Sequence, residues 1–379
     1  MKEFSHRERI LAAMEMQKPD RVPLMCQFSF GFMLKQLKIS PVEFWFDAEY
    51  FAEGLVRMRE IFDFDGILVS LHGHKKDWKN DILEIKKEDE TEVVYFEDRK
   101  MIFVPDDLPI TKYFGKKPVK NISQVSHSDI PGKIEYIPVS NNLHFCIDEQ
   151  DKFRIFDLIY ASVKDEFSIH GEVTSPFDYF LDLLGHQQGL TALIDDPEKC
   201  KVILQKFTDG IIQLAGGMCE KKIDAVKISS PFAGKGFISP GFYREFILPY
   251  ESQIISTVKD EGKFVYLHTC GHIGDRLELM RDSGASGIEC LDPPPVGDVE
   301  LSEAFGRIGN DMFIKGNIDS VNVLLRGTEA EMISDVKNRI ETGKNGKGFI
   351  LSTACSIAPN VHKDRIKVLY ELVNEFGRY

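Results

Sequence analysis

The amino-acid sequence predicts an α/β protein of the (β/α)₈, or TIM-barrel, class, built as a single domain over residues 1–379. Three observations lead to this prediction. Short apolar runs rich in β-branched and aromatic residues alternate with stretches in which apolar residues recur at helical spacing. Polar or small residues end most of these runs, as expected at the mouth of a barrel. A length of 379 residues also suits one barrel that carries an insertion.

Eight segments qualify as barrel strands, and six of them alternate with helical patterns. They are residues 21–27 (RVPLMCQ), 66–71 (GILVSL), 167–173 (FSIHGEV), 225–230 (AVKISS), 264–270 (FVYLHTC), 287–292 (GIECLD), 312–318 (MFIKGNI) and 349–354 (FILSTA). Helices are predicted between the later strands, for example over residues 240–260 and 330–342. An open doubly wound sheet would alternate in the same way, but no G-x-G-x-x-G follows any strand, which disfavours a nucleotide-binding fold.

The region of about residues 75–165 does not follow this alternation. Residues 92–96 (EVVYF) and 101–104 (MIFV) flank the charged sequence EDRK, a pattern that predicts an antiparallel hairpin. Residues 116–142 are rich in Pro, Ser and Lys and predict an irregular excursion. We therefore expect an inserted irregular and antiparallel region near the barrel mouth, not an independent domain.

Composition excludes several classes of function. The net charge of −13 and the pI near 5.3 disfavour a nucleic-acid surface, which needs clustered Lys and Arg. The first residues (MKEFSHRERI) lack the apolar stretch of a signal peptide, and no run approaches the roughly 18 apolar residues of a membrane span. The sequence thus predicts a cytoplasmic protein with no nucleic-acid or membrane partner, whose seven cysteines are reduced.

Catalytic side chains of a barrel come from the carboxyl ends of its strands and from the loops that follow. At those positions this sequence is much more polar than within the strands. The residues concerned are Gln27, His72, Glu172, Ser229, Ser230, His268, Cys270, Asp292, Asn317 and Cys355.

Within this set, His268 and Cys270 are the most informative pair. Residues two apart on a strand point to the same face, so both side chains can aim at one point. Cys355 follows the last strand of the barrel. One imidazole and two thiolates suit zinc, and three protein ligands leave a fourth position open. The alternative is that all three are buried packing residues. Cys26 also lies at a strand end and is a possible extra ligand, whereas four cysteines are interpreted as structural: Cys146, Cys200, Cys219 and Cys290.

Several segments together resemble the uroporphyrinogen decarboxylase superfamily. They are residues 7–23 (RERILAAMEMQKPDRVP), 238–249 (ISPGFYREFILP), 268–271 (HTCG), 316–319 (GNID) and 355–359 (CSIAP). The resemblance extends over nearly the whole chain and implies a (β/α)₈ barrel. The superfamily contains decarboxylases and also cobalamin-linked methyltransferases that act on coenzyme M or related thiols.

The resemblance to the methyltransferase branch is the stronger one. A decarboxylase follows its Arg-x-Pro element with an arginine-rich loop, which holds the carboxylates of the porphyrinogen. Here Arg21-Val22-Pro23 is followed by LMCQFSFGFML, which contains no arginine. The methyltransferase branch carries H-x-C and a distant Cys as zinc ligands, and these match His268, Cys270 and Cys355.

This resemblance implies a zinc-dependent methyltransferase that works with a corrinoid (cobalamin) carried by a corrinoid-binding partner protein. The small molecule would be a methyl donor or a thiol acceptor. A decarboxylase of tetrapyrrole metabolism is the alternative, and a non-catalytic barrel that binds a corrinoid or a partner is a third possibility. The direction of methyl transfer is open.

Supporting roles are expected for other residues at the strand ends. Glu172 would take a substrate proton or occupy the fourth zinc position, and the alternative is a solvated rim glutamate. Asp292 is expected to orient His268, and the alternative is a turn-stabilising aspartate. Asn317 would bind substrate or cap a helix that begins near residue 319. Substrate contacts are also expected for Gln27, His72 and Ser230. For Lys227, the sequence does not decide between the barrel interior and the helices.

Overall fold

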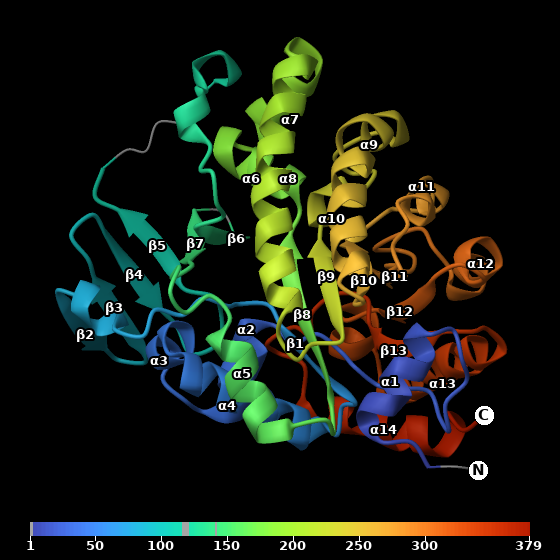
Figure 1. The fold of residues 1–379 in the computed structure, drawn as a ribbon. Coiled ribbons are helices and arrows are strands. Elements are labelled where there is room, and N and C mark those ends of the chain that lie inside the picture. Colours follow the sequence, from blue (N-terminus) through green and yellow to red (C-terminus); the bar gives the residue numbers. More distant parts are fainter. Residues whose placement is uncertain (1–2, 116–120, 141) are drawn as a thin grey trace.

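The computed structural model describes residues 3–115, 121–140 and 142–379. Within these residues a curled parallel sheet of seven strands forms the centre of the molecule, in the order β1-β8-β9-β10-β11-β12-β13 (Figure 1). Its strands are β1 (Gly66–Val69), β8 (Ser168–Thr174), β9 (Ala225–Ser229), β10 (Phe264–Thr269), β11 (Gly287–Cys290), β12 (Phe313–Ile318) and β13 (Phe349–Thr353). Each is buried almost throughout, as expected of strands covered on both faces. Seven of the eight predicted strands are therefore confirmed.

The remaining predicted strand, residues 21–27, is not a regular strand. It is an extended segment that bridges the two edges of the sheet. The N–H of Met25 donates to the Leu351 carbonyl of β13 at 3.0 Å, and the Leu24 carbonyl accepts from the N–H of Asp65, next to β1, at 2.8 Å. Pro23 has no N–H to give, and the N–H of Leu24 bonds to the Asp65 side chain, so a continuous ladder cannot form. The segment nevertheless takes the eighth position of the barrel.

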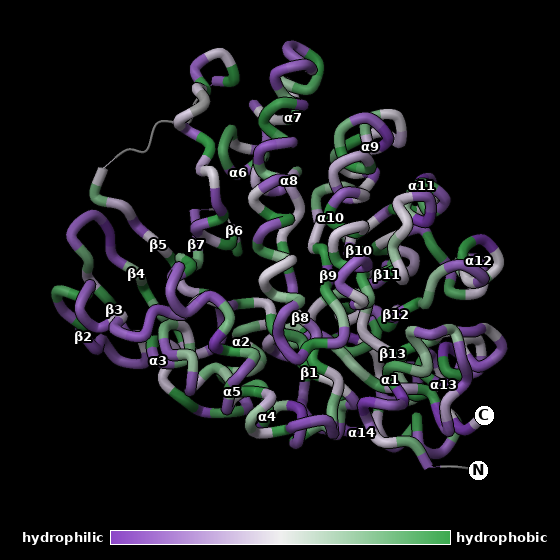
Figure 2. The backbone as a smooth tube through the Cα atoms, viewed as in Figure 1, coloured by the Kyte–Doolittle hydropathy of each residue, from purple (hydrophilic) through white to green (hydrophobic). Residues whose placement is uncertain are grey.

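Helices surround the sheet, and Figure 2 shows hydrophobic and hydrophilic residues alternating along the outer helices. The helices are α1 (His6–Met14), α2 (Phe30–Leu37), α3 (Pro41–Phe46), α4 (Ala48–Phe62), α5 (Arg154–Val163), α6 (Pro176–Leu184), α7 (His186–Asp195), α8 (Pro197–Cys219), α9 (Pro240–Phe246), α10 (Leu248–Asp260), α11 (Leu277–Asp282), α12 (Leu301–Ile308), α13 (Glu329–Asn345) and α14 (Lys363–Phe376).

The predicted helices over residues 240–260 and 330–342 are present, with different boundaries. The first is divided into α9 and α10 at Ile247, because Pro249 begins a new first turn. The second is α13, which starts at a capping box between Thr328 and Glu331. In the described part of the chain, no helix is both long and apolar enough to cross a lipid bilayer.

An antiparallel sheet lies to one side of the barrel (Figure 1). It consists of β2 (Glu84–Glu88), β3 (Thr91–Tyr95), β4 (Arg99–Phe103) and β5 (Ile110–Tyr113), joined in that order. The predicted hairpin is confirmed as β3 and β4. Phe46 of α3 fixes this sheet to the barrel, because its ring packs against the rings of Trp78, Phe96 and Phe103 at centroid distances of 5.2 to 6.1 Å.

The predicted irregular region, residues 116–142, lies partly outside the described residues, which omit 116–120 and 141. Its end forms the first strand of a hairpin, β6 (Tyr136–Ser140) and β7 (Leu143–Cys146). Asp182 of α6 holds this hairpin by accepting from Tyr136 Oη at 2.8 Å and by bonding His144 Nε2 at 2.9 Å. Because α6 follows the carboxyl end of β8, the hairpin lies near the mouth.

Candidate metal centre and active site

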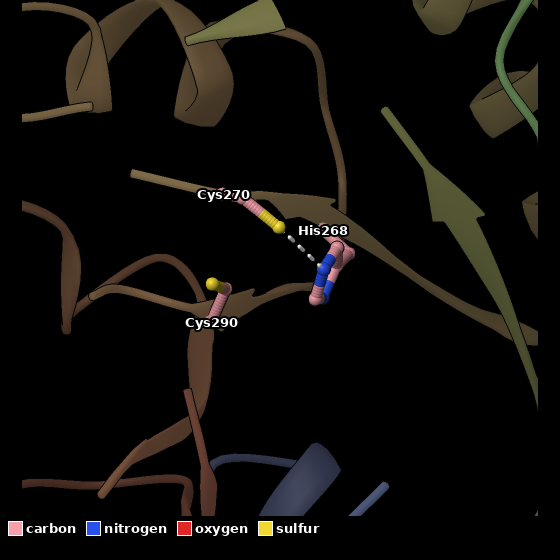
Figure 3. Close-up of side chains that lie close together, drawn as sticks. All are labelled: His268, Cys270 and Cys290. Carbon is pink, nitrogen blue, oxygen red and sulfur yellow. Dashed lines mark hydrogen bonds between the residues drawn. The ribbon is translucent and has the colours of Figure 1, made fainter. Parts of the chain in front are cut away.

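Two predicted ligands, His268 and Cys270, meet at the carboxyl end of β10. Figure 3 shows their side chains directed toward one another, with Cys270 Sγ 3.3 Å from His268 Nε2. His268 is the fifth residue of the strand, and Cys270 directly follows its end. Their common orientation is the one that spacing along a strand predicts.

A third donor comes from β11. Cys290, the last residue of that strand, places its thiol beside His268 and Cys270 (Figure 3). Nitrogen and sulfur atoms of the three residues lie within 4.8 Å of one another. Ligand atoms around one tetrahedral zinc ion are roughly 3.5–3.8 Å apart, given its bond lengths. The donor set and its spacing therefore fit a zinc ion after small side-chain movements.

Cys355, the third predicted ligand, follows β13, and among the described residues it is not one of the three whose donor atoms lie within 4.8 Å of one another. The nearby thiols of Cys290 and Cys355, together with the His268 imidazole, hold the pKa of Cys270 well below its usual range. One thiolate surrounded by two thiols and an imidazole is the chemistry of a soft-metal site. The structure therefore groups Cys290 with His268 and Cys270, whereas the predicted ligand Cys355 lies near that group without being part of it.

Glu289 orients His268 from the other side. Its Oε2 lies 2.8 Å from His268 Nδ1, so His268 Nε2 is the ring nitrogen that faces the cysteines. Burial opposes a charged imidazole, but Cys270 and Glu289 raise the pKa of His268 to about 9. A carboxylate behind a histidine ligand fixes the ring and its tautomer. Asp292 was predicted for this role, and that prediction is wrong: its Oδ2 accepts from the Gly271 N–H at 2.7 Å and from the Cys290 thiol at 3.2 Å.

Two buried lysines neutralise Glu289. Lys315 of β12 pairs with its Oε1, and Lys227 Nζ of β9 lies 3.2 Å from its Oε2. These cations, together with His268, hold the pKa of Glu289 well below its usual range against the effect of burial. Lys227 therefore faces the barrel interior and not the surrounding helices.

Lys227 also links Glu289 to two residues predicted for the site. Its Nζ lies 3.4 Å from Glu172 Oε2 and donates to Gln27 Oε1 at 2.7 Å. Glu172 and Gln27 therefore lie in the barrel interior, Glu172 two strands from β10 and Gln27 on the segment beside β13. The side chain of Glu172 is 13% exposed, and its Oε2 atom is buried.

The other predicted substrate contacts are buried. Ser230 is next to the site, and its backbone N–H donates to the His268 carbonyl at 2.8 Å. His72 is enclosed by Phe153 and Phe156, and burial lowers its pKa to about 4. The amide of Asn317 bonds to the Leu291 carbonyl and to Arg339. The cap at the following turn is Asp319, not Asn317.

Sequence reasoning missed Glu289, Cys290 and Lys315. A signal for two of them was present, because a charged residue interrupts each of the apolar strands GIEC and FIKGNI. Such residues are costly to bury alone and predict a buried partner. Cys26 is buried, which raises the pKa of its thiol to about 11, and within the described residues it is outside the group of possible metal ligands.

The sequence profile of the uroporphyrinogen decarboxylase (URO-D) family matches residues 133–376. The chain belongs to this family. Among its relatives, the methylcobamide:CoM methyltransferase MtbA of Methanosarcina mazei is 24% identical over 99% of both chains. The uroporphyrinogen decarboxylase of Gloeobacter violaceus is 27% identical over 48% of this chain and 50% of its own.

A solved structure supports the same fold. A methyltransferase from Methanosarcina mazei superimposes with a TM-score of 0.73 and 20% sequence identity, covering 99% of both chains. At this identity the likeness establishes the fold alone, and it confirms the predicted TIM-barrel class.

In this URO-D family member, the arginine of the Arg-x-Pro element lies far from the candidate metal centre. Arg21 forms two bonds to Asp65, at 2.9 and 3.0 Å, before the amino end of β1. It is therefore occupied at the end of the barrel opposite the strand ends that carry His268 and Cys270. The two lysines beside the site, Lys227 and Lys315, are already paired with Glu289.

Proposed function

We propose that this protein is a zinc-dependent methyltransferase that moves a methyl group between a corrinoid, carried by a partner protein, and a small thiol or methylated molecule. The observation that carries the proposal is the cluster of His268, Cys270 and Cys290 at the carboxyl ends of β10 and β11, with the Cys355 thiol after β13 close enough to influence Cys270. The full-length match to methylcobamide:CoM methyltransferases supports it.

His268, Cys270 and Cys355 would hold the zinc ion in this proposal. When bound, zinc would lower the pKa of a coordinated thiol and supply a thiolate nucleophile at neutral pH. Coenzyme M, the thiol named for the relatives, is the first substrate to test.

Glu172 would accept the proton that a substrate thiol gives up. Apart from its ion pair with Lys227, its Oε2 has no hydrogen-bond partner among the described residues. Lys227 would keep the carboxylate in place, and Gln27 would hold Lys227. Ser230, Asp292, His72 and Asn317 would shape the pocket around these groups.

The decarboxylase alternative is supported by matches to uroporphyrinogen decarboxylases over about half of the chain. A substrate with many carboxylates needs arginine forks. Arg21 is bonded to Asp65, and the nearby lysines are paired, so the site offers such a substrate few cations.

The test compares the wild-type protein with Cys270→Ala and Cys355→Ala, with Cys146→Ala as a control at an exposed cysteine. We expect wild type and control to bind one zinc ion and to demethylate methylcobalamin in the presence of coenzyme M. Both site variants should lose most of the zinc and nearly all of the transfer while keeping their helical content. If both variants kept full zinc occupancy and full methyl transfer, Cys270 and Cys355 would not be zinc ligands and the proposed metal centre would be wrong.

A further inference from the structure

Cys290 lies on the opposite side of its strand from the one that regular pairing predicts. In the parallel register of β10 and β11, His268 is paired with Glu289, and Thr269 is paired with Cys290. Side chains alternate between the faces of a sheet, so Cys290 should share the face of Thr269, away from His268. Its thiol instead lies within 4.8 Å of the donor atoms of His268 and Cys270.

The backbone at the end of β11 accounts for this reversal. Cys290 has φ +86° and Leu291 has φ +56°, and both residues are fully buried. Residues with a side chain adopt this left-handed region only at a cost, which persists where the surroundings impose it and is common at functional sites. The turn directs the thiol toward the group instead of toward the helices.

The neighbouring strand, β12, has a glycine at the position where the backbone of Cys290 comes closest to it. Gly316 of β12 is paired with Cys290, and a Cβ at Gly316 would lie 2.8 Å from the Cys290 carbonyl oxygen. Any other residue at this position would push the turned backbone away. Asp292 adds a further constraint by accepting a hydrogen bond from the Cys290 thiol at 3.2 Å.

We propose that Cys290 is a ligand of the metal ion at this centre, so that His268, Cys270, Cys290 and Cys355 together supply one nitrogen and three sulfurs. The inference rests on the proposed function for the presence of zinc. The inference goes beyond that function because it assigns a fourth protein ligand, so a substrate thiol would have to displace one of the four to coordinate zinc. A packing role for Cys290 explains neither the two left-handed residues nor the thiol's place beside His268.

The experiment counts sulfur ligands in the full-length protein, purified with a phosphine reductant so that no added thiol can bind. X-ray absorption at the zinc edge separates sulfur near 2.3 Å from nitrogen near 2.0–2.1 Å. The Co(II)-substituted protein gives an independent count, since the intensity of thiolate-to-cobalt charge transfer rises with the number of thiolates. The variant is Cys290→Ala, with Cys146→Ala at an exposed cysteine as the matched control.

Wild type and control should show three sulfurs and one nitrogen. In Cys290→Ala the sulfur count should fall to two, and the charge-transfer intensity should fall by about one third, in proportion to the thiolates lost. Two sulfurs in the wild type, or an unchanged spectrum in Cys290→Ala, would overturn the inference and leave the proposed zinc enzyme intact. A wild type that binds no metal would refute both. If Cys290→Ala fails to fold, the number of sulfur ligands in the wild type tests the inference by itself, with three sulfurs supporting it and two contradicting it.

Discussion

At the scale of single residues, the sequence predicted the donors whose positions follow from strand periodicity. His268 lies on β10 and Cys270 directly follows the strand's end, and side chains two residues apart converge wherever the backbone is extended. Cys290 was not predicted as a ligand because the direction of its side chain depends on the left-handed backbone of Cys290 and Leu291. Nothing in the sequence GIECLD indicates that conformation. Asp292 was predicted to orient His268 because it ends the strand, but the register places Glu289 opposite His268. Register between strands is a tertiary property.

Replacing Glu289 by Gln tests whether this carboxylate orients His268. The amide has nearly the same shape but lacks the charge that fixes the imidazole and balances Lys227 and Lys315. We expect zinc affinity to fall by roughly 10- to 100-fold, the range typical for such carboxylate partners of metal-binding histidines. The measurement is a competition titration with a zinc chelator.

The matched control is Glu278→Gln, which removes a carboxylate on α11 that is paired with Arg307 of α12. Its zinc affinity should equal that of the wild type. Equal affinity in Glu289→Gln as well would show that His268 needs no carboxylate partner.

At the scale of helices and strands, periodicity predicted the elements that are buried on a regular face. The seven strands of the curled sheet and the hairpin of β3 and β4 belong to this class. β2 was missed because all five of its residues, EIKKE, are exposed and show no alternation. The segment 21–27 was predicted as a strand from its composition, although Pro23 and the bond from Leu24 to Asp65 interrupt its ladder.

The hairpin of β6 and β7 is held near the mouth by Asp182 of α6, and this contact can be tested. Removing the carboxylate in Asp182→Ala deletes the bonds to Tyr136 and His144. Bonds to a charged group contribute about 1.5–3 kcal/mol each. We expect faster hydrogen exchange across residues 136–146 and little change in β2–β5, measured by mass spectrometry.

Asp195→Ala, at an exposed position on α7, is the control for this variant. If exchange in residues 136–146 stayed at the rate of this control, contacts other than Asp182 would hold the hairpin.

At the scale of the whole molecule, one end of the barrel carries the candidate site and the other end carries the ion pairs that stabilise the fold. The carboxyl ends of the strands carry the cysteines and His268. The opposite end is fastened by Asp65, which accepts bonds from Arg9, Arg21 and His6 and from the N–H of Leu24. This division is the usual one in barrels, with chemistry at one face and stability at the other. It also explains why part of the N-terminal motif that resembles the URO-D superfamily has a structural role.

Asp65→Asn should destabilise the fold without affecting the metal centre. Burial opposes ionisation of Asp65, but His6, Arg21 and Arg9 lower its pKa to about 2. A carboxyl with a lowered pKa adds stability that is complete above its unfolded pKa of about 3.9 and is lost as the pH falls toward about 2. Breaking a buried ion pair costs about 3–5 kcal/mol.

Urea unfolding should therefore show that Asp65→Asn lowers the free energy of unfolding by about 3–5 kcal/mol at pH 7. The difference in unfolding free energy between wild type and variant should become smaller below about pH 4, because wild-type Asp65 then takes up a proton. Asp63→Asn, an exposed neighbour, is the control. If the urea midpoint of Asp65→Asn equalled that of the control, Asp65 would not stabilise this end of the barrel. A loss of unfolding free energy that stayed the same between about pH 4 and pH 2 would also contradict this role.

The most direct test of the account is whether thiol-dependent methyl transfer requires zinc. The wild-type protein is stripped with a chelator, divided, and reloaded with zinc or with magnesium. Each sample is then assayed for demethylation of methylcobalamin by coenzyme M and, in parallel, for decarboxylation of uroporphyrinogen. We predict transfer that disappears on stripping, returns with zinc and not with magnesium, and is accompanied by no decarboxylation. Decarboxylation that is indifferent to zinc, with no transfer to coenzyme M or to homocysteine, would contradict the account.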